Sequence, residues 1–67
     1  MFGDLLKQIM IERGYNQKTL AIACGLTEAA MSRYINNTRE PNFKTLKKLC
    51  KVLKVSADYF ISGKELK

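Results

Sequence analysis

The feature that most constrains the fold is the recurrence of apolar residues at helical spacing in short segments separated by Gly, Asn, Thr and Pro. In the segment after Asp4, for example, Leu6, Ile9 and Met10 lie three and four positions apart, on one face of a helix. Five such segments follow one another, and none has the alternation of a strand. Helices this short are not stable alone in water. The sequence therefore predicts an all-α, compact five-helix domain.

Polar residues that suit the position before a helix mark where each segment begins. Asn, Asp, Ser and Thr side chains accept hydrogen bonds from the free N–H groups of the first turn. The second helix is expected to cover residues 17–23 and the third residues 28–36, with Gly25 in a left-handed turn between them. Gly14 is expected to end the first helix, and Asn37 suits the left-handed conformation after the third. The expected caps are, in chain order, Asp4, Asn16, Thr27, Asn42 and Ser56.

The apolar faces predict a single domain of residues 1–62, followed by a basic tail of residues 63–67. The lysine-rich face of the fourth helix is more typical of a solvated surface than of a binding site. In the fifth helix the sequence leaves open whether all apolar residues are buried or one or two form a dimer contact. The expected core residues of the last three helices are Met31, Tyr34, Ile35, Phe43, Leu46, Leu49, Cys50, Leu53, Tyr59, Phe60 and Ile61.

Charge and cysteine usage limit the partners and cofactors. A net charge of +6 favours an anionic partner, nucleic acid before a membrane surface, although a solvated basic surface would look the same. No signal peptide follows Met1, and no apolar run approaches the ~20 residues of a membrane span, so a cytoplasmic protein without membrane contact is expected. Cys24 and Cys50 are too few for a zinc site and are expected to be reduced and buried. We expect no metal and no other cofactor.

Catalytic patterns are missing from the sequence. The chain has no His, so neither a Ser-His nor a Cys-His arrangement is possible, and its six acidic residues are scattered without paired-carboxylate spacing. The sequence therefore predicts a protein that is not an enzyme.

The stretch of residues 17–36 is the most informative part of the chain. Leu20 and Met31 are spaced to meet between two helices that cross steeply, and Ala21 is small enough for close approach. Gly25 suits the turn, and Leu26 can fill the gap beneath it. The outer face of the helix that follows carries short or polar side chains, as a helix in the DNA major groove requires.

These residues, from Gln17 through Leu20, Ala21 and Gly25 to Asn36, resemble the helix-turn-helix domain of lambdoid phage repressors and Cro proteins, the xenobiotic-response-element type. A second matching block runs from residue 41 to residue 60, so the resemblance covers nearly the whole chain. It implies a lambda-repressor-like fold with the helix-turn-helix at the second and third helices. It further implies a small bacterial or phage transcriptional regulator, with repression favoured over activation.

The resemblance also implies which residues contact DNA. Arg33 can pair bidentately with guanine, Glu28 can accept from cytosine, and Ala29 can lie against a thymine methyl group. The residues expected to face bases are Glu28, Ala29, Ser32 and Arg33. Those expected at phosphates are Gln17, Lys18, Thr27, Asn36, Asn37, Thr38, Arg39 and Lys44.

The chain departs from the family pattern at two kinds of position. Family members often carry an Arg and a Glu that form an ion pair where this chain has Met10 and Ile35. We expect these two side chains to touch, because a hydrophobic contact can replace a buried ion pair without loss of stability. Family members also often have Gly where this chain has Asn37 and Lys54. A left-handed Lys54 would cost about 1–2 kcal/mol, so a different turn is expected there.

The predicted partner is a palindromic double-stranded DNA operator, bound by a homodimer. Two alternatives remain open at this point. One is an antitoxin-type or other protein-interaction module whose DNA binding is secondary. The other is a basic module that binds an acidic protein or a membrane surface without any DNA sequence preference.

Overall fold

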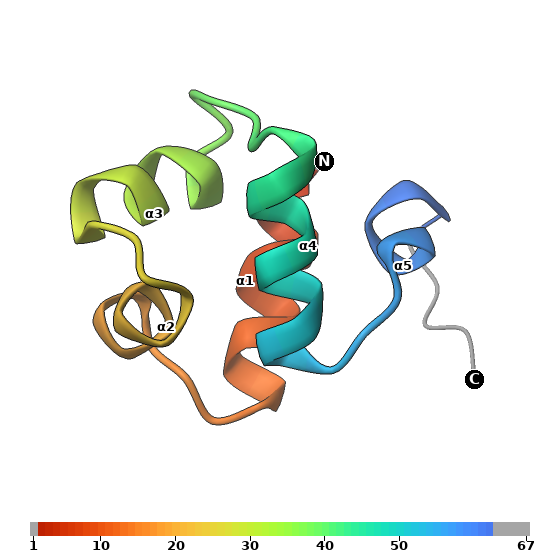
Figure 1. Cartoon of the computed structure of the whole chain (residues 1–67), viewed down its shortest axis with the longest axis horizontal. Coiled ribbons are helices and arrows are strands. Elements are labelled where there is room, and N and C mark those ends of the chain that lie inside the picture. The colour runs from red at the N-terminus through yellow and green to blue at the C-terminus, as the bar shows by residue number, and fades with distance from the viewer. Residues whose placement is uncertain (1, 63–67) are drawn as a thin grey trace.

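The computed structural model describes residues 2–62, and within this range the regular secondary structure is entirely helical, as predicted. Figure 1 shows α1 and α4 in the middle of the molecule, with α2 and α3 on one side of them and α5 on the other. No helix in this range is long and apolar enough to cross a membrane. The predicted basic tail of residues 63–67 lies outside the described residues. The helices are α1 (Phe2–Glu12), α2 (Gln17–Cys24), α3 (Glu28–Ile35), α4 (Phe43–Leu53) and α5 (Ala57–Ser62).

The core is formed by apolar side chains from every helix, which confirms most of the predicted core. Leu49 and Leu53 are buried as expected. In the fifth helix, where burial was left open, Tyr59 is buried and Phe60 packs half-buried against the core, and the side chain of Ile61 lies outside the described part of the structure. The prediction is wrong for Phe43, the first residue of α4, which is 72% exposed. The largest fully buried side chains are Leu6, Ile9, Leu20, Met31, Leu49 and Leu53.

Three of the five predicted caps are confirmed by hydrogen bonds to the first turn of their helices. The side chains of Asn16, Thr27 and Asn42 accept from backbone N–H groups three residues ahead, at 2.8–3.1 Å. Asp4 is not a cap, because α1 begins at Phe2. Ser56 does precede α5, but its buried Oγ has no hydrogen-bond partner among the residues that the structure describes.

Among the described residues, four take left-handed backbone conformations at the ends of helices. Gly25 and Asn37 do so as predicted, with φ of 68° and 62°, and Gly14, which ends the first helix as expected, has φ of 80°. The expectation of a different turn at Lys54 is wrong, because this residue is left-handed with φ of 59°. Its N–H and the N–H of Val55 both donate to the carbonyl of Cys50 and end α4, and Val55 is then buried. The turn places an apolar side chain in the core, which offsets the strain.

Both cysteines are free, as expected, but only Cys24 is buried. Cys50 is half-buried on the side of α4 that faces α5, so the prediction of a buried thiol is wrong for this residue. Burial raises the pKa of both thiols, and the nearby Lys48 ammonium partly counteracts this for Cys24.

Candidate nucleic-acid interface

The orientation of α3 is set by its buried face. Met31 is fully buried and Tyr34 nearly so, and both belong to the core that also contains Leu20 and Ala21 of α2. The Leu26 N–H donates to the Ala21 carbonyl at 2.8 Å, which closes the turn between the two helices. The outer face of α3 is therefore held toward solvent by packing that the sequence pattern predicted.

This outer face brings the four residues expected to face bases together. They lie at positions i, i+1, i+4 and i+5 of α3, and residues at this spacing share one face of a helix. Glu28, Ala29 and Arg33 are exposed, and Ser32 is half-buried. The Ser32 Oγ accepts a hydrogen bond from Asn36 Nδ2 at 3.2 Å, so the hydroxyl proton remains able to donate outward.

The carboxyl end of α3 is closed by three donors that converge on one acceptor. The Arg33 carbonyl accepts from the Thr38 N–H at 3.0 Å, the Thr38 hydroxyl at 3.1 Å and the Arg39 N–H at 3.3 Å. Both donors of Thr38 are thereby engaged within the protein. Its contribution at this surface is to shape the loop that presents Arg39, which is exposed.

The end of α3 is also joined to the beginning of α1. The Asn37 Oδ1 accepts a hydrogen bond from the Gly3 N–H at 2.8 Å, although the two residues are 34 positions apart in the sequence. Gly3 is buried, and a Cβ at this position would overlap the Ile35 carbonyl oxygen and come within 2.7 Å of that of Tyr34. Sequence reasoning missed Gly3; the only available signal was a glycine in the first turn of a helix.

The residues expected at phosphates flank α3 on both sides. Gln17 is the first residue of α2, beside the capping box of Asn16 and Thr19, and Lys44 lies in the first turn of α4. Helix amino termini carry partial positive charge and free N–H groups, which favour anions. Thr27 Oγ1 already accepts from the Ala30 N–H, which leaves its hydroxyl proton available. Of the residues expected at phosphates, only Gln17 is half-buried; the exposed ones are Lys18, Thr27, Asn36, Asn37, Thr38, Arg39 and Lys44.

The positions where family members carry an ion pair are apolar in the structure as well. Met10 is buried, and Ile35 is half-buried and packs against the same core. A direct contact between the two side chains stays a prediction. Elsewhere Arg13 Nε donates to the Leu53 carbonyl at 2.9 Å, a link between α1 and α4 that sequence reasoning also missed.

A helix held by its inner face across a tight turn, with a largely polar outer face, is the arrangement typical of helix-turn-helix DNA-binding domains. A helix-turn-helix family model matches residues 6–60, and the chain belongs to this family, of the Cro and C1 repressor type. The predicted fold class and family are therefore confirmed.

Two proteins of Bacillus subtilis (strain 168) are similar in sequence. The SPbeta prophage-derived uncharacterized HTH-type transcriptional regulator YonR is 38% identical over 63 residues, which cover 94% of this chain and 58% of YonR. The uncharacterized HTH-type transcriptional regulator YqaE is 35% identical over 63 residues, which cover 94% of this chain and 54% of YqaE. The chain thus spans little more than half of either relative.

Solved structures agree with the sequence comparison. The structure of SinR, a master regulator for biofilm formation, in complex with DNA superposes with a TM-score of 0.86 at 31% identity, over 91% of this chain and 98% of that one. The restriction-modification controller protein C.AhdI from Aeromonas hydrophila superposes with a TM-score of 0.83, over 88% of this chain and 89% of that one; at 24% identity it supports the fold alone. The chain is a DNA-binding domain of the transcriptional-regulator kind.

Proposed function

We propose that this chain binds double-stranded DNA sequence-specifically by placing α3 in the major groove, and that it acts as a repressor in the cytoplasm. The observation that carries the proposal is the outer face of α3, which is polar, accessible and held by buried Met31 and Tyr34. Relatives named as transcriptional regulators, and a similar SinR structure containing DNA, support it. This role requires neither a catalytic group nor a cofactor.

Four side chains of α3 read bases in this proposal. Arg33 donates two hydrogen bonds to the O6 and N7 atoms of guanine, and each such pair contributes about 1–3 kcal/mol of discrimination. Glu28 accepts from a cytosine amino group, and the Ala29 methyl group packs on that of thymine. Ser32 donates its hydroxyl proton, because Asn36 occupies an acceptor position of its oxygen.

The phosphate contacts position α3 without selecting sequence. Gln17 and Lys18 at the start of α2 hold one strand, and Thr27 donates its free hydroxyl proton at the start of α3. Asn36, Arg39 and Lys44 hold the backbone beyond the other end of α3. Asn37 contributes its amide NH₂ group, since Gly3 occupies its carbonyl oxygen, and Thr38 acts by shaping the loop.

The operator in this proposal has two-fold symmetry and binds a homodimer. A single module of this size covers only about 600–1,000 Å² of DNA-contacting surface, which gives weak binding. Two copies on half-sites about 34–36 Å apart would place both α3 helices on the same side of the duplex.

The proposal is tested by selecting bound sites from random double-stranded DNA at two salt concentrations. We expect a palindromic motif that is lost when Arg33 and Ser32 are replaced by Ala, and retained when the exposed Lys7 of α1 is replaced by Ala. Recovery of no motif, with retention that disappears as salt rises, would mean that charge alone holds DNA. That result would refute sequence-specific binding.

A further inference from the structure

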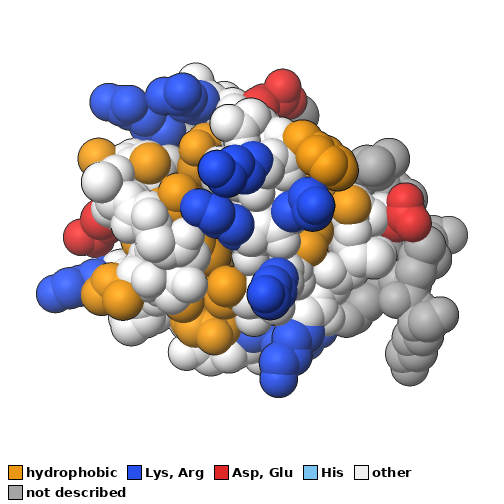
Figure 2. Space-filling model, in the orientation of Figure 1, with side chains coloured by type: hydrophobic (Ala, Val, Ile, Leu, Met, Phe, Trp, Pro, Cys, Tyr) orange, Lys and Arg blue, Asp and Glu red, His pale blue; other side chains and the backbone are white. Residues whose placement is uncertain are grey.

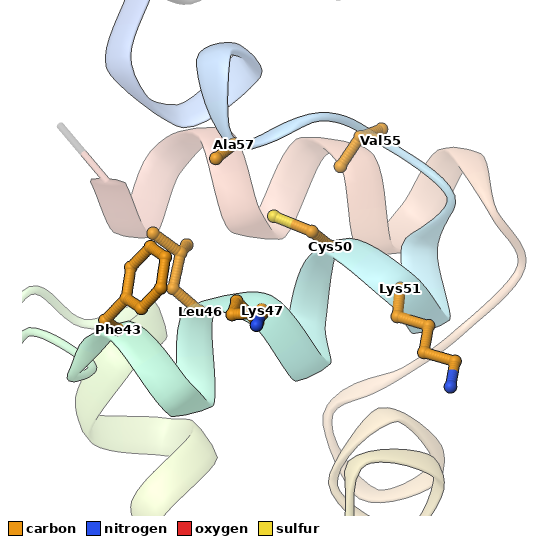
Figure 3. A pocket seen from close by; sticks show the side chains of 7 residues that line it. All are labelled: Phe43, Leu46, Lys47, Cys50, Lys51, Val55 and Ala57. Carbon is orange, nitrogen blue, oxygen red and sulfur yellow. The ribbon is translucent and has the colours of Figure 1, made fainter.

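A hollow of about 370 Å³ lies along the side of α4 that faces α5 (Figure 3). Leu46 and Cys50 of α4 point across it toward Val55, in the segment before α5, and Ala57, the first residue of α5. Phe43 stands at one end and is 72% exposed, an unusual position for a large aromatic side chain. The volume is in the range of sites that enclose apolar groups of a ligand, about 300–1,000 Å³. We call this surface the α4 groove.

One edge of the α4 groove is strongly basic. Lys47 and Lys51 line it one helical turn apart, and α4 contains no acidic residue. The Lys47 Nζ lies 5.6 Å from the centre of the Phe43 ring, so the charge sits directly beside the exposed aromatic group. Figure 2 shows that basic side chains gather over α4, with hydrophobic side chains on either side of them.

A second hollow lies on the other side of this basic edge and is likewise lined by both apolar and lysine side chains. It lies between α2 and α4, is lined by Ile22 and Val52 among others, and shares Lys51 with the α4 groove. Ile22 is 69% exposed. The lysines of α4 therefore form a ridge between two accessible apolar surfaces. A lysine face that only contacts solvent has no need of such apolar surfaces beside it.

The α4 groove lies away from the face expected to contact bases. In both Figure 1 and Figure 3, α3 and α5 lie on opposite sides of α4, and the groove opens on the side of α5. An occupant of the groove would leave the outer face of α3 accessible. The groove can thus be tested without reference to DNA binding.

We propose that the α4 groove is a docking site for an acidic amphipathic helix of a partner protein. Apolar side chains of the partner, one turn apart, fill the space among Phe43, Leu46 and Cys50. Two carboxylates four residues apart on the partner helix reach Lys47 and Lys51. The two pairs match because residues four apart on any α-helix lie about 5–6 Å from each other. The charge disfavours the simplest alternative, a second copy of this basic chain, because two such lysine ridges would repel each other. An apolar floor offers a phosphate backbone no hydrogen-bond donors.

The test uses the ¹⁵N-labelled chain and a synthetic Ala-based helical peptide of about 15 residues. The peptide carries two Leu residues four positions apart on one face, flanked by two Glu residues four positions apart. We expect its amide chemical-shift changes to be confined to α4 and residues 55–57. A peptide with Lys in place of Glu, and one with Ser in place of Leu, should each bind at least about fivefold more weakly.

Matched variants of the chain separate the groove from the general charge of the surface. Phe43→Ser should weaken peptide binding at least about fivefold, whereas Ile11→Ser, which removes a similarly exposed apolar side chain from α1, should not change it. Lys51→Gln should weaken binding about threefold, and Lys7→Gln should leave it unchanged. Because all four positions are exposed, each variant is expected to fold.

Four results would overturn the proposal. They are the absence of binding at millimolar peptide, equal binding of the Lys peptide, shift changes outside the groove, and conversion of a dimer to a monomer by Phe43→Ser in sedimentation equilibrium. The last would show that the groove binds a second copy. A further arm adds double-stranded DNA in place of the peptide. Because Lys44 is itself expected at a phosphate, only shifts beyond the first turn of α4, at residues 47–51 and 55–57, would assign the groove to phosphate contacts instead.

Discussion

Replacement of two left-handed residues by glycine should change stability in opposite directions. Lys54 has φ of 59° and Asn37 has φ of 62°, so glycine relieves backbone strain at both. At Lys54 the strain is about 1–2 kcal/mol. Against this, glycine destabilises the folded state by about 0.5–1 kcal/mol, because it gives the unfolded chain more conformational freedom. The free energy of unfolding of Lys54→Gly should therefore rise by about 0.5–1 kcal/mol.

At Asn37 the balance is reversed. Asn tolerates the left-handed conformation, so little strain is relieved. Its side chain accepts from the Gly3 N–H at 2.8 Å, and loss of this acceptor leaves a part-buried donor unpaired, at about 1–3 kcal/mol. Asn37→Gly should thus lower the free energy of unfolding by about 1–2 kcal/mol, although many family members carry glycine at this position.

Thermal unfolding followed by circular dichroism measures both effects. In a domain of this size 1 kcal/mol corresponds to about 4–8 °C in Tm. Lys54→Ala is the control, because it removes the charge but keeps the Cβ and should leave Tm within about 2 °C of the parent chain. Equal shifts for Lys54→Gly and Lys54→Ala would refute the role of strain. A higher Tm for Asn37→Gly would refute the role of the bond to Gly3.

Three further changes test other parts of the structure. Gly3→Ala should lower the free energy of unfolding by about 1–3 kcal/mol in urea titrations, since its Cβ would overlap backbone carbonyls at the end of α3. Thr27→Ala should lower it by about 1 kcal/mol in the same assay, because the bond to the Ala30 N–H is lost, whereas Thr27→Ser should retain most of it. Iodoacetamide at pH 8 should modify Cys24 and Cys50 more slowly than in the urea-unfolded chain, since burial raises the pKa of both thiols. By the same linkage their stabilising contribution is complete below the pKa of the unfolded thiols and is lost as pH rises above it. Equal alkylation rates in the folded and unfolded chains would contradict this.

Local interactions could be predicted from the sequence, and interactions between distant segments could not. Asn16 and Thr27 were predictable caps because donor and acceptor lie three residues apart. The beginning of α1 was missed because its Gly3 N–H is satisfied by Asn37, 34 positions along the chain. Phe43 was assigned to the core because its spacing fits the buried face of α4. Whether another element covers this first residue of α4 depends on the tertiary packing, which helical spacing does not reveal.

The same division applies to the candidate site. The outer face of α3 follows from helical spacing, so Glu28 and Arg33 could be assigned to it directly. Which donors and acceptors remain free could not be read from the sequence: the Thr38 hydroxyl donates to the Arg33 carbonyl, and the Asn37 side-chain oxygen accepts from the Gly3 N–H. A list of polar residues near the recognition helix therefore overstates how many can donate to phosphate.

The bond between Gly3 and Asn37 has a practical consequence for labelling the molecule. It holds the first turn of α1 against the end of α3, while Phe2 in the same turn packs against Phe60 of α5, with ring centres 4.8 Å apart. A fluorophore attached ahead of Phe2 would therefore lie close both to the end of α3 and to α5. A dye at this position would not distinguish the arrival of DNA from occupancy of the α4 groove, so the two surfaces are better followed separately through the backbone amides of α3 and α4.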